Sequence, residues 1–194
     1  ARAGVVVGSG ITLSKDGDIF ATGVTTSTTF VGTLDGAINS DSNTNVKFGS
    51  TALDSNTTGS LNVAVGDAAL TANTTGANNV AVGRNAMIVN TTGDSNTAVG
   101  RSALQQNAAS NNTAIGRDAL AANTTGSLNV AVGAYALDAA TTATANTAVG
   151  IYALSSSTTG AENVAIGRQS LFSNTTANDN ISIGVNAMYA NTTG

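Results

Sequence analysis

The sequence predicts an all-β protein, built mainly as a parallel β-solenoid and preceded by a short β-hairpin region. Three observations predict this fold. A motif of the type Asn-Val-Ala-Val-Gly recurs nine times, its glycine returning every 17 residues except for one spacing of 16. The second and fourth residues of the motif are mostly β-branched, which favours strands over helices. The stretch Asn-Thr-Thr-Gly follows most copies, and its residue types are typical of corners.

The repeats divide the chain into an N-terminal region, residues 1–44, and a solenoid, residues 45–194. The working consensus is N-[VT]-A-[VI]-G-x-x-A-L-x-x-N-T-T-G-x-x, and its residues are numbered 1 to 17 below. Each repeat is expected to form one coil with two short strands and two turns. A single coil cannot bury its own apolar face, but stacked coils bury a continuous one. Nine coils spaced about 4.8 Å apart predict a rod roughly 40 Å long.

Strand alternation assigns the side chains of each coil to two faces. Positions 2 and 4 share one face, which we expect to point inward, and Leu or Met at position 9 is expected to be a second inward anchor. Position 1 is always asparagine, so stacked coils are expected to align these amides into a hydrogen-bonded ladder. The predicted ladder comprises Asn45, Asn62, Asn79, Asn96, Asn112, Asn129, Asn146, Asn163 and Asn180.

Position 3 is alanine in seven of the nine repeats, and Lys47 and Ser182 stand there in the end repeats. Because position 3 faces opposite to positions 2 and 4, a monomeric solenoid would carry polar residues there. A row of small apolar residues instead predicts an interchain seam at which copies of the chain pack together. The seam residues are Ala64, Ala81, Ala98, Ala114, Ala131, Ala148 and Ala165.

The first 44 residues lie outside the repeat. Residues 11–20 are predicted to form a hairpin, because Asp16-Gly17 is a strong turn signal between alternating segments. A threonine-rich, strand-prone stretch follows at 21–32, and 36–44 are expected to link into the solenoid. The chain lacks an initiator Met and stops within a repeat, so we expect a piece of a longer protein.

Composition excludes several function classes. Charged residues make up 9% of the chain, aromatic residues 4%, and His, Cys, Pro and Trp are absent. We therefore expect no enzyme activity, no catalytic residues, no cofactor and no metal site, since histidine and cysteine chemistry is lost. A net charge of −4 argues against nucleic-acid binding. No apolar run reaches the length of a transmembrane helix, so membrane insertion is not expected.

The repeat N-[VT]-A-[VI]-G-x-x-A-L resembles the head repeats of trimeric autotransporter adhesins (the YadA-like head). With its N-T-T-G spacers it is also similar to repeats in bacteriophage tail-fibre proteins, and residues 8–32 are similar to virion structural segments. The resemblance covers residues 45–194 and about 8–36. It implies a left-handed parallel β-roll, an intertwined homotrimer, and a role in adhesion or virion structure. The 17-residue repeat is longer than the usual adhesin repeat.

The resulting hypothesis is a trimeric, rod-shaped structural protein of a phage tail fibre or other virion appendage, which supports or presents a host-attachment site. Its partners would be two further copies, other virion subunits and a host-surface glycan or protein. A bacterial trimeric adhesin head at the cell surface is the first alternative. A monomeric ice-binding or extracellular matrix solenoid is the second, because threonine pairs recur at positions 13 and 14.

Several side chains are candidates for surface contacts. Arginine at position 6 follows the corner glycine in four repeats, and Tyr135 and Tyr152 share position 7 of adjacent repeats, where they are expected to stack. The arginines suit anionic glycans and the tyrosines suit sugars, although solvated corners and simple packing explain both sets. The arginines are Arg84, Arg101, Arg117 and Arg168. The Asn-Thr-Thr triplets match glycosylation acceptors, but a recurring turn role explains them without a glycan.

Overall fold

A computed structural model of the chain describes residues 11–13, 19–21 and 44–193. The chain divides into two units, residues 1–36 and 37–194, which are described separately. The predicted boundary at residue 44 remains a prediction, because residues 37–43 lie outside the described ranges.

The first unit contains a two-stranded antiparallel sheet. Strand β1 (Ile11–Leu13) pairs with β2 (Ile19–Ala21), with Ile11 opposite Ala21 and Leu13 opposite Ile19. These strands are part of the predicted hairpin. The turn at Asp16-Gly17, the threonine-rich stretch beyond Ala21 and the linker to residue 43 lie outside the described residues.

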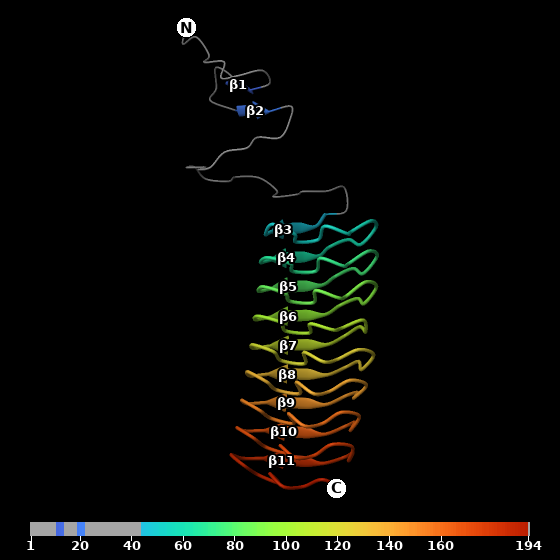
Figure 1. Cartoon of the computed structure of the whole chain (residues 1–194), viewed down its shortest axis with the longest axis vertical. Helices are drawn as coiled ribbons and strands as arrows, with labels where there is room; N and C mark the ends of the chain where they lie inside the picture. Colours follow the sequence, from blue (N-terminus) through green and yellow to red (C-terminus); the bar gives the residue numbers. More distant parts are fainter. Residues whose placement is uncertain (1–10, 14–18, 22–43, 194) are drawn as a thin grey trace. The chain divides into compact units, whose positions relative to one another are not determined.

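The second unit is a β-solenoid whose strands form one parallel sheet of nine strands in sequence order. Figure 1 shows these strands stacked one beneath the next, each joined to its neighbour by a loop that closes one coil. Equivalent repeat positions lie opposite each other, as Val63 lies opposite Val80. The strands are β3 (Val46–Phe48), β4 (Val63–Val65), β5 (Val80–Val82), β6 (Thr97–Val99), β7 (Thr113–Ile115), β8 (Val130–Val132), β9 (Thr147–Val149), β10 (Val164–Ile166) and β11 (Ile181–Ile183). The predicted all-β solenoid of stacked repeats is therefore confirmed.

Each repeat contributes one strand, not the two that were predicted. The segment after the strand is an arc, because its residues at positions 7 and 9 take left-handed backbone conformations, as at Ala68 (φ 57°) and Leu70 (φ 51°). A strand cannot continue through such residues. The arc still stacks by backbone hydrogen bonds, since Leu70 N–H donates to the Ala86 carbonyl of the next coil at 3.0 Å.

The strand faces are the reverse of the prediction. Alanine at position 3 points into the coil and is 0% exposed in every repeat that carries it, from Ala64 to Ala165. Positions 2 and 4 point outward and are half-buried or exposed in all nine strands. The predicted alanine seam is therefore wrong: Ala64, Ala81, Ala98, Ala114, Ala131, Ala148 and Ala165 lie inside a single chain, where no second chain can reach them.

The width of the coil explains this inversion. The buried core consists mainly of alanine at positions 3 and 8 and of Leu or Met at position 9, as in Ala81, Ala86 and Met87. A coil of 17 residues has room for one large side chain, Leu or Met, between its two walls. The wall opposite that side chain must therefore carry a small residue. Two β-branched side chains per strand would overfill that space.

The glycine at position 5 is required at the end of each strand. Gly100 has a φ of 131°, and a Cβ there would lie 2.6 Å from the carbonyl oxygen of Gly116 in the next coil. Both the backbone conformation and the close stacking of coils exclude a side chain.

Candidate functional site: the outer face of the parallel sheet

The outer face of the sheet is formed by the side chains at positions 2 and 4 of strands β3 to β11. These eighteen side chains are only Val, Ile, Thr and Phe, with no charged residue. The exposed members among them include Phe48, Ile115, Val130 and Ile166, and in β11 Ile181 and Ile183 reach 71% and 68% exposure. We call this surface the β-branched face.

The β-branched face is regular because the strands are in register. Adjacent strands lie about 4.8 Å apart and side chains two residues apart along a strand lie roughly 7 Å apart, so the face is a narrow strip of two rows about 40 Å long. Parallel sheets normally have both faces covered. A contiguous exposed apolar strip with polar borders is typical of an association surface.

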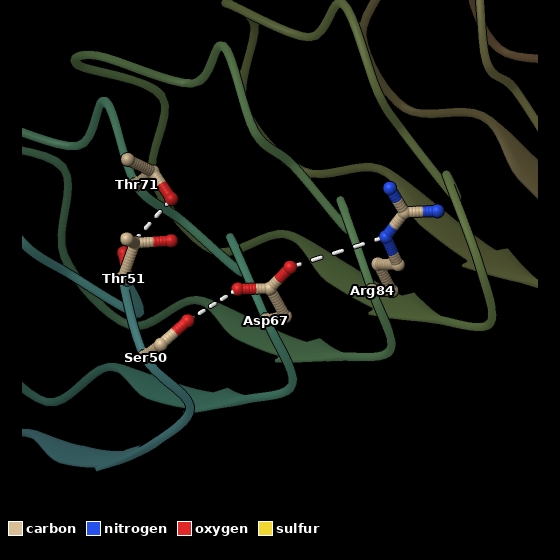
Figure 2. A network of polar contacts seen from close by, with 5 residues as sticks. All are labelled: Ser50, Thr51, Asp67, Thr71 and Arg84. Carbon is tan, nitrogen blue, oxygen red and sulfur yellow. Dashed lines mark hydrogen bonds and ion pairs between the residues drawn. The ribbon is translucent and has the colours of Figure 1, made fainter.

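Polar residues border the β-branched face at the corner that follows strands β3 to β7 and β10, whereas Ala134, Ile151 and Val185 occupy the corners after β8, β9 and β11. In the first coils, Ser50 Oγ donates a hydrogen bond to Asp67 Oδ1 at 2.5 Å, and Arg84 Nε lies 3.9 Å from Asp67 Oδ2. Figure 2 shows these three side chains bridging successive coils, beside Thr71, whose hydroxyl donates to the Thr51 carbonyl. In the first five coils the corner is therefore a polar rim whose side chains join neighbouring coils.

The candidate arginines lie on this rim, and acids partner three of them. Arg101 Nη2 lies 3.0 Å from Asp118 Oδ2, and Arg117 Nε lies 3.6 Å from the same oxygen. Arg168 Nη1 donates to the side-chain oxygen of Gln169. The pairing partly neutralises the row, so an anionic glycan would have to compete with aspartates for these guanidinium groups.

The candidate tyrosines belong to a string of aromatic rings across four coils. Tyr135 and Tyr152 stack with their centroids 4.9 Å apart and their planes 3° apart, as predicted. Tyr152 and Phe172 form a T-shaped pair with their centroids 6.3 Å apart, and Phe172 stacks on Tyr189 at 5.0 Å. The Arg117 guanidinium lies 4.5 Å from the Tyr135 centroid.

This stacking limits what the aromatic string can bind. Arg117 lies over the Tyr135 ring, and Tyr152 stacks on that ring as well. A sugar that stacks on an aromatic side chain needs a free ring face. The geometry therefore favours mutual packing of the rings, and leaves mainly their edges and hydroxyl groups for contact with a ligand.

The predicted asparagine ladder is present inside the coil. Asn62 N–H donates to Asn45 Oδ1 at 2.8 Å, and Asn79 N–H donates to Asn62 Oδ1 at 2.9 Å. The amide nitrogen of Asn62 donates to the Gly76 carbonyl at 2.9 Å. The same pattern continues to Asn163 and Asn180, so the role of the row is structural.

A second asparagine ladder was missed by the sequence reasoning. The asparagines that open the Asn-Thr-Thr triplets at position 12 are buried, except for the half-buried Asn56 and Asn191 in the end coils. Asn73 Nδ2 donates to Asn56 Oδ1 at 2.9 Å and to the Gly76 carbonyl at 3.0 Å. An N-linked glycan on Asn73 would have to displace these bonds. The threonines at position 13 instead face outward, where Thr74 Oγ1 donates to the Thr91 carbonyl.

One carboxyl group of the arc has a perturbed pKa. Burial raises the pKa of Asp138 above its ordinary value of 3.8, and a hydrogen bond from Ser155 Oγ at 2.5 Å works against this rise. Asp138 and Ser155 share position 10 in adjacent coils, and their contact joins one coil to the next.

Within residues 11–13, 19–21 and 44–193, no three His, Cys, Asp or Glu side chains gather to hold a metal ion. The same part of the chain contains no helix that is long and apolar enough to span a membrane. No protein-family model and no curated protein matches the sequence, and no solved structure matches the fold.

Proposed function

We propose that the chain is a rod-forming structural protein of a phage tail fibre or a related virion appendage, in which three copies associate through the β-branched face. The observation that carries the proposal is the uncharged composition of that face over all nine strands. The virion setting and the three-fold state derive from the resemblance of the repeats. The adhesin-head alternative derives from the same resemblance and shares the rod and the assembly.

Other copies of the same chain are the occupant that best fits the β-branched face. Each copy carries the same strand spacing over the same length, so two faces can align their rows without a mismatch. Closed cyclic symmetry brings three such strips to a common axis, removes them from water and leaves the rims outside. The arginine and aspartate pairs of the rim would then surround the axis as a solvated border.

The mechanism of such a rod is mechanical. Backbone hydrogen bonds join coil to coil around the perimeter, as from Val63 N–H to the Asn79 carbonyl at 2.8 Å, and the asparagine ladders run parallel to them inside. A rod held in this way resists bending and presents attachment sites at a fixed distance.

The test is the solution mass of the 194-residue chain and of two charge variants, measured by size-exclusion chromatography with light scattering. The expected mass of the wild type is about 57 kDa, three times the 18.9 kDa of one chain. Val132→Glu with Val149→Glu places two charges on the β-branched face and is expected to give monomers with an unchanged circular dichroism spectrum. Thr125→Glu with Thr142→Glu adds the same charges at exposed corners and should leave the trimer intact.

A wild-type monomer would overturn the proposed assembly, and thermal hysteresis would then test the ice-binding alternative on the same sample. A wild-type trimer that both variants preserve would place the interface elsewhere. A dimer would keep the face as the interface and refute the three-fold state.

A further inference from the structure

Strand β10 has opposite charges at its two ends. Glu162, at position 17 of the preceding repeat, comes before it and Arg168, at position 6, follows it, and both residues are exposed. The Arg168 guanidinium donates to the side-chain oxygen of Gln169 at 3.1 Å, but neither Arg168 nor Glu162 takes part in an ion pair with any described residue. Among the nine strands of the parallel sheet, β10 alone has an acid at position 17 before it and an arginine at position 6 after it.

The fold holds these two charges apart at opposite borders of the β-branched face. Glu162 and Arg168 are six positions apart in the sequence, with the strand between them, so about 20 Å of backbone separates them. Each charge therefore faces outward at its own border, where a second surface can meet it.

A cyclic assembly brings the two borders together. When three copies surround an axis parallel to the rod, their β-branched faces form the sides of a triangle, and the strands at one level run around it in the same direction. At each corner of the triangle, the end of one copy's strand meets the beginning of the next copy's strand. Position 6 of one copy then lies against position 17 of its neighbour.

We infer that Arg168 of each copy forms an ion pair with Glu162 of the next copy, and that this pair fixes the register in which the rods align. The inference rests on the three-fold assembly proposed above and names residues that align it. A shift by one coil sets Glu162 against Ile151 or Val185, which are apolar and 49% and 64% exposed. Complementary charges at an interface contribute mainly to specificity of this kind.

The level of β9 supports the same register with apolar residues. Ala145 stands at position 17 before β9 and Ile151 at position 6 after it. In register, the exposed Ile151 meets Ala145 of the next copy, and the contact removes both from water. The level of β11 has no such match, because Asp179 stands before the strand and Val185 after it. Asp179 therefore offers a control at the same repeat position as Glu162.

Charge reversal tests the pair, with assembly measured by light scattering over a dilution series. Glu162→Arg and Arg168→Glu each place like charges at three contacts, so each is expected to raise the concentration at which half of the trimer dissociates by about tenfold or more at low salt. The combined variant restores opposite charges and is expected to return this concentration to the wild-type value. In about 1 M NaCl the single variants should approach the wild type, because salt screens exposed charges.

The control and the outcomes separate this pair from the assembly itself. Asp179→Arg makes the same charge change one coil away and is expected to leave the dissociation unchanged. A wild-type monomer would overturn both the assembly and the pair. A wild-type trimer that the single reversals leave intact, that the combined variant does not restore, or that Asp179→Arg weakens equally would overturn the pair alone.

A zero-length cross-link gives a second test. Arg168→Lys keeps the positive charge and supplies an amine, which a carbodiimide joins to a contacting carboxylate as an amide with loss of water. Covalent dimers and trimers are expected, with linking peptides that join position 168 to Glu162. Links to other carboxylates only, or no links at all, would overturn the assignment.

Discussion

The first asparagine ladder should dominate the stability of the coils, and Asn79→Ala tests this in its regular part. The variant removes the bond from Asn79 Nδ2 to the Gly93 carbonyl (2.8 Å) and the two bonds that Asn79 Oδ1 accepts from Asn96 N–H (2.9 Å) and Asn96 Nδ2 (3.1 Å). Asn96 N–H is buried and is left without an acceptor. The Gly93 carbonyl keeps a bond from Asn90.

These losses set the magnitude. An orphaned buried donor costs about 1–3 kcal/mol, and each of the two other bonds contributes about 1 kcal/mol, so Asn79→Ala is expected to lower the free energy of unfolding by about 3–5 kcal/mol. Asn180→Ala is the matched control at the same repeat position. Asn180 is half-buried, donates to Asn163 Oδ1 and the Asn178 carbonyl, and supports no following ladder residue in the described chain.

Urea unfolding monitored by circular dichroism measures both variants, at one fixed chain concentration because assembly shifts the midpoint. The control should lose about 1 kcal/mol or less, since water can replace its partners. If Asn79→Ala and Asn180→Ala lose equally little, the ladder is a consequence of stacking and does not stabilise it. That result would refute the reasoning.

Three further outcomes follow from the backbone and from one carboxyl group. Leu128 has a φ of 63° and is 59% exposed, so Leu128→Asn should raise the unfolding free energy by up to about 1 kcal/mol, because asparagine tolerates the left-handed region; a lower urea midpoint would contradict this. Gly100→Ala should abolish folding or lower the free energy of unfolding by several kcal/mol, the typical cost of an overpacked and strained site. Thr125→Ala, at an exposed corner, should leave the thermal midpoint unchanged. The raised pKa of Asp138 means that the folded state binds its proton more tightly than the unfolded state, so stability should fall as pH rises from 3.8 through the folded pKa; the pH profile of Asp138→Asn should lack this step.

The sequence was sufficient for the fold because the repeat samples each position nine times. Position 4 is apolar in every repeat and glycine follows it every time, which locates all nine strands of the sheet. Alternation along a strand relates positions 2, 3 and 4 to each other, but it does not say which side is the interior. The β-branched residues suggested the wrong side because large apolar residues are usually buried.

The coil width would have corrected this assignment. Position 9 is always Leu or Met, and a narrow coil that holds this side chain needs a small residue on the opposite wall. The alanine row meets that need within one chain, so it requires no interchain seam. The left-handed residues at position 9 have no sequence signal, since leucine and methionine do not favour a positive φ, and at position 7 only Asn85, Asp118 and Asn186 are of types that do.

The recurring asparagine at position 12 is a sequence signal for the second ladder, but the same residues are also typical of a turn. Position 12 is asparagine in seven of nine repeats, as regular as many core positions, yet Asn-Thr-Thr-Gly is also a natural corner sequence. The two roles coincide in the structure. Asn73 bonds to the Gly76 carbonyl across the corner and to Asn56 in the preceding coil. One residue type thus serves the turn and the stack.

The distribution of apolar residues connects the fold to its proposed assembly. Inside most coils, one fully buried Leu or Met shares the space with alanines and asparagine amides, so the interior combines a single large apolar side chain with hydrogen bonds between coils. The β-branched residues, which in most proteins would form the core, lie outside. A chain with this arrangement has a polar network that specifies its own coil and an apolar strip that stays in contact with water until another surface covers it. Folding and association are therefore expected to use different residues: the ladders determine the shape of the rod, and the β-branched face determines how many rods come together.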